Sequence, residues 1–307
     1  MVAGLLLATQ AEADPPPPID WTNIETVIAR PGKPGPLMWR AHKGEAELIL
    51  IGVVGPVPKD LAWNKDGVTD ALTGARLLLT GAKASVGIVE GLWYLAWHSS
   101  DVYLPGDMTV DQTLPEALRK RYVAAVAKSG KDPDRYASMR PPLALLRLEG
   151  DVIEAEGLSV KEPSDSIERI ARHAGVRAKP VADYEAIPML RQLPAMSQVA
   201  NLACVKDALD DMDALDAHAR AAAEAWANGD LDGMKANYSE QRFQSCLQAV
   251  PGAAALFERA VRDSVAAAND ALGRKGRTAM VVNVGVLLRK GGILDRLAAE
   301  GLEVEGP

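Results

Sequence analysis

The sequence predicts an α/β protein in which a central mixed sheet is built from N- and C-terminal β-α units, with a large helical middle region. Strand-like apolar runs lie near both ends of the chain, at residues 37–54 and 278–284, whereas residues 110–272 are mostly helical in pattern. The chain has 307 residues and 48% of them are hydrophobic, so it is long enough to bury a full core without disulfides or metals.

The N-terminal unit has a predicted β-β-α-β order. Residues 37–42 and 47–54 are strand-like, and Lys43-Gly44 between them favours a hairpin. The second run is apolar without interruption at its centre, as is typical of a strand that is covered on both faces. A short helix at residues 64–72 and a strand at residues 76–79 complete the unit.

Helices with start and stop signals fill the middle of the chain. Thr113 is a predicted N-cap, with Pro115 and Glu116 in the first turn of its helix and Gly130 beyond the helix end. Ser85 is a predicted N-cap for the helix that follows it. The elements predicted after the N-terminal unit are helices at residues 86–97, 114–129, 140–156, 164–174, 197–228, 253–272 and 293–299, and strands at residues 179–182, 278–284 and 303–305.

Charge and hydropathy exclude several classes of partner. The net charge is −7 and the pI is about 5.3, which disfavours nucleic acids and anionic membranes because both need a basic face. No apolar run reaches the roughly 18–20 residues that span a bilayer. The partner classes that remain are a protein and a small-molecule ligand, neither of which the sequence identifies. The sequence does not predict an oligomeric state.

The sequence predicts three consecutive parts of the chain: a leader, an arm and the folded domain. Residues 1–13 begin with an apolar stretch, Met1 to Ala8, and end in Ala11-Glu12-Ala13, the small-x-small pattern of a signal-peptidase site. They lack a basic region, so they are either an ordinary N-terminus or part of a longer signal peptide, which we favour. Residues 14–36 are a proline-rich arm, and residues 37–307 form one domain with a helical insertion at about 110–272. We therefore expect an exported protein, periplasmic or secreted.

The chain contains two cysteines, Cys204 and Cys246. In an oxidising compartment an even pair favours a disulfide, and two buried free thiols are the alternative. Closing a loop of about 40 residues would stabilise the fold by about 4 kcal/mol in the chain-entropy estimate. The disulfide expectation therefore depends on export.

Two local patterns could carry chemistry by themselves. Residues 83–87 resemble a nucleophile elbow, but Lys83 stands where the first glycine is needed, so a capping role for Ser85 is favoured. Asp207, Asp211 and His218 fall on one face of a helix that turns about 100° per residue, and these donors could hold a divalent cation. A solvated acidic face explains the segment better, because its carboxylates are spread around the helix.

Four further segments occur in an order that resembles a known family. They are Gly35 to Pro58, Trp226-Ala227-Asn228-Gly229-Asp230, Arg262-Asp263 and Val281 to Leu294. Together they resemble the TraB/GumN family over residues 35–305. That family includes the Tiki-type metalloproteases and is similar to the erythromycin-esterase-like hydrolases. The resemblance implies a Gly-x-x-His motif after an N-terminal strand and a Gly-x-Gly-His motif after a C-terminal strand, with both histidines on a metal.

The chain departs from this pattern at both histidines. The first motif, which begins at Gly52, ends in Gly55, and the second has Val286 beside Gly285 in place of its histidine. Thr80 stands where the family often has a glutamate. The positions that the resemblance assigns to the family pocket are Gly52, Gly55, Thr80, Glu185, Arg262, Gly285 and Val286.

These departures decide between two functional classes. A catalytic metal needs about three protein ligands and an open position for water, and neither glycine nor valine offers a donor. We therefore expect a non-catalytic, cell-envelope binding or scaffolding protein without cofactor or metal. The alternative is a metal-dependent hydrolase or peptidase, using manganese or cobalt, with replacement ligands from the Asp207–His218 helix or from His98.

Overall fold

The sheet contains strands from both ends of the chain, as the sequence predicts. The computed structural model describes residues 19–22, 35–238, 246, 250 and 252–307, so the predicted leader and most of the arm lie outside the described residues. Strands β2, β9, β4 and β7 are parallel, and β1 and β10 continue the sheet in antiparallel order. Across the sheet the strands are β10 (Val304–Glu305), β1 (Met38–Lys43), β2 (Ala46–Val53), β9 (Gly276–Asn283), β4 (Leu77–Thr80) and β7 (Ala178–Pro180).

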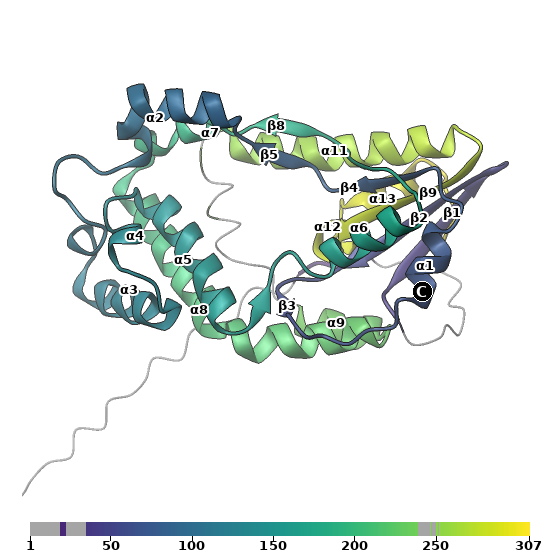
Figure 1. The fold of residues 1–307 in the computed structure, drawn as a ribbon, viewed down its shortest axis with the longest axis horizontal. Coiled ribbons are helices and arrows are strands. Elements are labelled where there is room, and N and C mark those ends of the chain that lie inside the picture. Colours follow the sequence, from purple (N-terminus) through teal and green to yellow (C-terminus); the bar gives the residue numbers. More distant parts are fainter. Residues whose placement is uncertain (1–18, 23–34, 239–245, 247–249, 251) are drawn as a thin grey trace, which may run out of the picture.

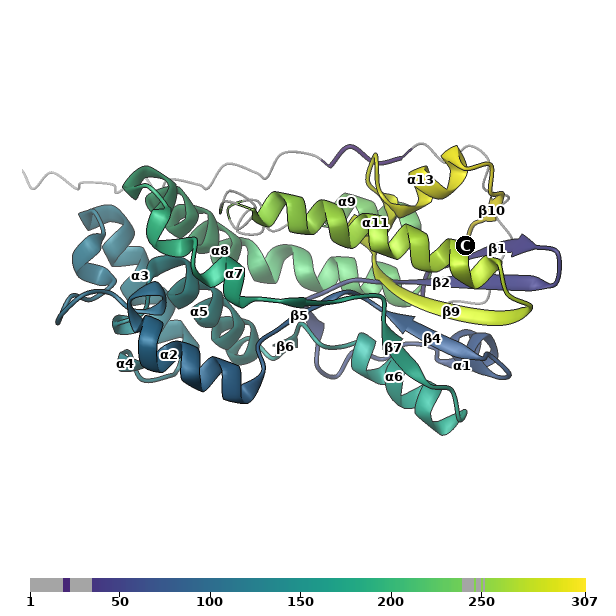
Figure 2. The ribbon, with the colours of Figure 1, turned by 90° about the horizontal axis from the view of Figure 1, so that it is seen from above.

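Helices cover both faces of this sheet, which explains the uninterrupted apolar run in β2 (Figures 1 and 2). Leu48 and Leu50 face one core, and Ile49 and Ile51 face the other. Helices α1 (Asp66–Leu72) and α6 (Ser164–His173) pack on the second face. The first face is covered by α11 (Ala253–Leu272), α12 (Val284–Leu288), α13 (Ile293–Ala299) and the end of α8 (Gln198–Ala227).

A helical region with its own core lies beside the sheet (Figure 2). It is built on contacts among α3 (Glu116–Ser129), α5 (Pro141–Ala155) and α8, with α4 (Asp134–Ala137) at its side. The smaller elements are β3 (Val57–Pro58), β5 (Lys83–Ser85), α2 (Ile88–Val102), a 3-10 turn at Asp111–Thr113, β6 (Leu158–Ser159), β8 (Asp183–Glu185), α7 (Ile187–Leu190), a 3-10 turn at Leu193–Ala195 and α9 (Leu231–Asn237).

Two short ribbons join the sheet to the helical region. Strand β3 pairs with β6, and β5 pairs with β8. Both members of the second ribbon directly follow strands of the main sheet, and they lead into α2 and α7. Because β7 and α11 contact the sheet although they lie within residues 110–272, the chain returns to the sheet twice before its C-terminal unit.

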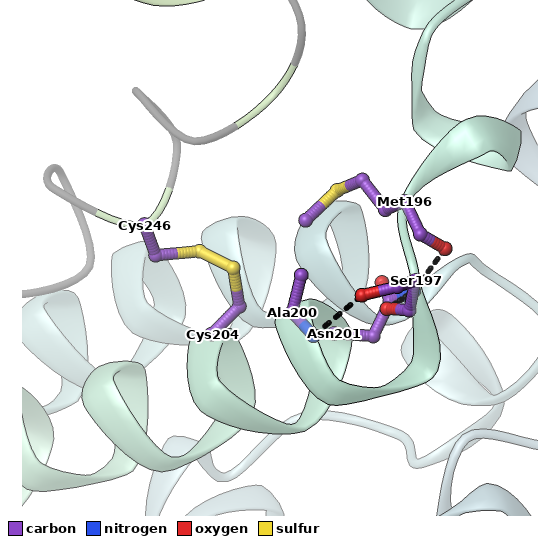
Figure 3. The surroundings of a disulfide bond; sticks show 6 residues. All are labelled: Met196, Ser197, Ala200, Asn201, Cys204 and Cys246. Carbon is purple, nitrogen blue, oxygen red and sulfur yellow. Dashed lines mark hydrogen bonds between the residues drawn. A yellow bond between two sulfur atoms is a disulfide. The ribbon is translucent and has the colours of Figure 1, made fainter.

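The disulfide predicted from the cysteine pair is present (Figure 3). Cys204 on α8 is bonded to Cys246, with 5.2 Å between the Cα atoms and a sequence separation of 42. Ser197 caps α8 by accepting a hydrogen bond from the Ala200 amide at 3.2 Å. Among the described helices, none is long and apolar enough to cross a membrane.

Two predicted N-caps are wrong. Ser85 lies in β5, where its hydroxyl donates to Asp183 at 2.7 Å, and Gly87 stands at the start of α2. Thr113 ends a 3-10 turn and donates to the Val110 carbonyl, so Pro115 takes the N-cap position of α3. In both places a polar side chain found a partner other than the helix amides.

Candidate functional site

The two segments that resemble the family motifs lie side by side. Strands β2 and β9 are adjacent and parallel, with Gly52 opposite Val282 and Val53 opposite Asn283. The residues that follow each strand therefore leave the sheet at the same edge. In open α/β sheets, ligands bind at the carboxyl ends of parallel strands. The geometry thus places the candidate site beyond Val53 and Asn283.

Two glycines at this edge are required by packing. A Cβ on Gly52 would lie 2.8 Å from the Trp39 ring and 2.9 Å from Val284. A Cβ on Gly285 would overlap the hydroxyl of Tyr238. Because real Cβ atoms do not approach other atoms this closely, a side chain at Gly52 would displace the buried Trp39 ring, and one at Gly285 would displace the end of the Tyr238 side chain.

Gly55 differs from these two glycines. Its backbone has no positive φ, and a Cβ there would meet only the Val160 carbonyl oxygen, at 3.7 Å. A side chain would therefore fit at position 55, where the family resemblance implies a histidine. Because Gly55 has no side chain, this space is continuous with a pocket.

That pocket contains carboxylates and an imidazole from the helical region. Gly55 lies in its wall with Glu149 of α5, Asp211 and His218 of α8, and Tyr238 at the end of α9. The pocket is small, with a cavity volume of about 50 Å³, and it opens to solvent. The remaining lining residues are mostly small or apolar: Val54, Pro56, Ala214, Leu215, Ala219, Ala222 and Asn237.

Glu149 is the most perturbed group of this pocket. It is 7% exposed, and burial together with the nearby charge of Asp211 raises its pKa to about 8. At neutral pH the Glu149 carboxyl is therefore mainly protonated.

Neighbouring residues fix the edge of the sheet against α8 and α9. The Trp226 indole, buried at the end of α8, donates to the Gly52 carbonyl at 2.7 Å. Asp230 caps α9 by accepting from the Gly233 amide at 2.9 Å. Trp226 and Asp230 are the ends of the Trp-x-x-Gly-Asp segment, so that segment holds the strand end in place.

Tyr238 connects the pocket to the second motif. Its hydroxyl donates to the Asn283 side-chain oxygen at 2.9 Å, and the same oxygen accepts from the Gly285 amide at 2.8 Å. Trp21, from the short described part of the arm, packs edge-on against the Tyr238 ring with 5.7 Å between centroids. The arm therefore reaches the border of the site, earlier in the chain than the predicted domain start at residue 37.

The other predicted pocket residues lie elsewhere. Thr80 is buried at the end of β4, level with Pro180 of β7, and Val286 is half-buried on α12. Glu185 lines a separate cleft with Arg259 and Gln192. Arg262 lies on the exposed face of α11, where its nearest acidic partner is Glu258 at 3.9 Å. None of these four lines the pocket that contains Gly55.

The carboxylates of α8 have two different surroundings. Asp210 and Asp213 accept hydrogen bonds from Arg121 at 2.8 and 2.7 Å, and Lys206 also pairs with Asp210. Asp211 and His218 line the pocket instead. His98, the other proposed replacement ligand, stacks on Tyr94 in α2 and lies outside this pocket.

The described residues do not fit the metal that the family resemblance implies. Gly55 has no side chain and Val286 offers only carbon atoms. No group of three or more His, Cys, Asp or Glu side chains in the described ranges is arranged to hold a metal ion. The donors that do line the pocket are two carboxyls and one imidazole on its helical wall.

The fold and this pocket together define an α/β protein with a candidate ligand site at the carboxyl ends of two adjacent parallel strands. The model of the TraB/PrgY/gumN family matches residues 37–306, nearly the whole chain, and the protein belongs to that family. A search of curated proteins and a search of solved structures each gave no significant match.

Two residues of the site were not identified from the sequence. Glu149 interrupts the apolar pattern of the helix at residues 140–156, and a charged residue on a buried face is a signal that sequence reasoning can use. Tyr238 carries no such signal. It follows α9 and reaches the site only because α8 and α9 pack beneath the strand ends.

Proposed function

We propose that this member of the TraB/PrgY/gumN family is a non-catalytic ligand-binding protein, and that the pocket at Gly55 takes a cationic amine group. The observation that carries the proposal is the Glu149–Asp211 pair on the wall that faces Gly55. Where relatives are expected to place imidazoles on a metal, this chain offers carboxyls and open space.

The charge state of the pair supports an amine as the ligand group. Like charges and burial keep Glu149 mainly protonated at neutral pH. A bound ammonium group would favour the charged carboxylate, so Glu149 would release a proton as the ligand binds. His218 and Tyr238 would add hydrogen-bonding groups, and the small apolar residues would contact an alkyl chain.

The binding experiment compares three isosteres of different charge: butylamine, butyramide and butyrate. Titration calorimetry at pH 7 should detect butylamine but neither of the others, and its heat should depend on the buffer because a proton is released. Asp211→Asn should weaken butylamine binding about tenfold, the equivalent of about 1.4 kcal/mol. Asp213→Asn is the matched control, since Asp213 pairs with Arg121 outside the pocket. Equal binding of the three isosteres would reject an amine site.

A second experiment tests the proposal that the protein is non-catalytic. The protein purified with added manganese or cobalt should contain no stoichiometric metal and should not hydrolyse a panel of peptides and esters. Neither Gly55→His nor Val286→His should give hydrolysis, because Val286 does not line the pocket that contains Gly55. Stoichiometric metal together with chelator-sensitive peptidase activity in the unmodified protein would overturn the proposal in favour of a metal-dependent hydrolase.

We also propose that the protein is exported and acts in the cell envelope, as a periplasmic or secreted binding or scaffolding protein. The Cys204–Cys246 disulfide supports this, because such bonds persist in oxidising compartments and are rare in the cytosol. Cell fractionation with thiol alkylation tests it. Protein recovered from the cytosol with both thiols alkylated would contradict export.

A further inference from the structure

Helix α2 exposes an apolar surface. The side chains on this surface are all large and hydrophobic, and the most exposed are Ile88 at 84%, Val89 at 79% and Trp97 at 72%. The others are Val86, Leu92, Trp93 and Leu95. Scattered exposed apolar residues are ordinary, but here they are contiguous on one helix.

The side of α2 that faces the protein is the more polar one. Tyr94 is 2% exposed, donates to Asp101 at 2.5 Å and lies beneath the guanidinium of Arg191. His98 stacks on Tyr94 with 4.8 Å between ring centroids. A surface helix normally turns its apolar side inward and its polar side to water. In α2 this arrangement is reversed, so hydrophobic burial within the described chain does not explain the sequence of the helix.

The apolar surface contains no charge. At about 100° per residue, Leu95, Ile88, Leu92, Val89 and Trp93 spread over an arc of roughly 160° with Trp97 beside it. The first charged residue, Glu90, comes at the border of this arc, next to the side that packs inward. Ala96 lies near the centre of the arc, and a small residue there lets another helix approach closely. A second identical surface would therefore meet no repulsion.

The size of the surface matches a protein interface. A tryptophan contributes roughly 150–250 Å² when fully exposed and an aliphatic side chain contributes less, so at their exposed fractions the seven together present on the order of 700 Å². The largest apolar patch of a typical monomer is roughly 300–600 Å². A standard interface buries about 800 Å² on each partner. The α2 surface is thus larger than a monomer usually shows and large enough for a stable dimer.

We propose that α2 is a self-association surface, on which a second copy of this chain packs its own α2 about a two-fold axis. Two-fold pairing brings the same patch together from both copies, so a surface without charge is self-complementary. A lipid surface fits less well. Interfacial helices carry lysines and arginines on their polar side, whereas the charged residues of α2 are Glu90 and Asp101, and the net charge of the chain is −7.

Sedimentation velocity of the full chain tests the proposal, with Val89→Glu and a matched control, Val199→Glu. Both valines lie on helices and both are 79% exposed, but Val199 is on α8 and is not one of the residues that form the α2 surface. The unmodified protein and Val199→Glu should sediment at twice 32.6 kDa. Val89→Glu should weaken the dimer at least tenfold, with unchanged circular dichroism and thermal melting.

A cross-linking variant tests the same surface by the gain of a covalent dimer instead of the loss of a dimer. Ala96→Cys should form a disulfide-linked dimer under mild oxidation, whereas Val199→Cys should stay monomeric on a non-reducing gel. A wild-type protein that is monomeric at every concentration would overturn the proposal. So would a dimer that Val89→Glu leaves intact, since its interface would then lie elsewhere. Monomers that co-sediment with phosphatidylcholine vesicles through α2 would also overturn it and assign the surface to lipid.

Discussion

Two buried carboxylates on the same helix behave in opposite ways. Glu149 and Asp151 lie two residues apart on α5 and are 7% and 8% exposed. Burial raises the pKa of Glu149 to about 8, and the charge of Asp211 adds to this. Burial also acts to raise the pKa of Asp151, but hydrogen bonds from Arg135 and Tyr136 outweigh it, so that pKa is lowered.

The difference shows that a cation and a phenol outweigh burial at Asp151, whereas at Glu149 burial is the larger cause of the raised pKa and the charge of Asp211 adds to it. Asp151 faces the core of the helical region, where a cation and a phenol hold its charge. Glu149 faces the pocket, where its charged neighbour has the same sign. The two groups should therefore affect stability at opposite ends of the pH range.

The largest effect should come from Asp151→Ala. The change removes the acceptor of the fully buried Tyr136 hydroxyl, at 2.7 Å, and leaves Arg135 without its partner. We expect the free energy of unfolding at pH 7 to fall by about 3 kcal/mol. Urea denaturation measures it. Because the folded-state pKa of Asp151 is lowered, its stabilisation is present at neutral pH and is lost as the pH falls below its ordinary value of 3.8.

If Asp151→Ala lowered the free energy of unfolding by less than about 1 kcal/mol, Asp151 would not be a structural carboxylate, and the contrast with Glu149 would be rejected. Asp151→Asn is the control for shape. It keeps an acceptor for Tyr136 and loses only the charge, so it should cost less than the alanine variant.

Glu149→Gln should act in the opposite direction. The stabilisation that Glu149 gives when protonated is complete below its ordinary value of 4.5 and is lost as the pH rises toward about 8. Glutamine stays neutral, so the variant should be more stable than wild type by about 2 kcal/mol at pH 6, by more at pH 8, and equal to it near pH 4. Thermal melts across this pH range measure the difference. Glu154→Gln, exposed on the same helix, should show no such dependence.

Tyr136→Phe tests the second partner of Asp151. The ring would keep its packing in the helical core, but Asp151 would lose one hydrogen bond while keeping Arg135. We expect a loss of about 1 kcal/mol at pH 7, measured by urea denaturation. A loss as large as that of Asp151→Ala would mean that the phenol, not the cation, holds the carboxylate.

Much of the sheet could be predicted because its signals are local. The uninterrupted apolar runs at the two ends of the chain became β2 and β9, which pair in parallel, and the predicted limits of α11 and α13 match the structure. The capping residues were less predictable, since Ser85 bonds to Asp183, which is 98 residues away. No local rule reveals a partner at that distance.

The candidate site could be predicted at the strands, but on its helical wall only Asp211 and His218 were singled out from the sequence. Gly52 lies near the end of β2, and Gly55 and Gly285 follow β2 and β9, whose pairing brings their ends together. Glu149 and Asp211 meet them only through the packing of α5 on α8, which depends on tertiary contacts that one sequence does not specify. The predicted Glu185 and Arg262 lie outside this pocket for the same reason: their positions depend on the β5–β8 ribbon and on the face of α11 that meets the sheet.

The smallest change in the free energy of unfolding should come from Asp211→Asn. This variant tests directly whether the charge of Asp211 acts on Glu149. Burial is the larger cause of the raised Glu149 pKa, and the charge of Asp211 is the smaller one. Removing that charge should shift the pH dependence of stability to lower pH and stabilise the fold by less than about 1 kcal/mol at pH 8. In a Glu149→Gln background the same change should give no shift, because the group that senses the charge is gone. If the shift persists there, Asp211 acts on another group, and the pair does not titrate as a unit.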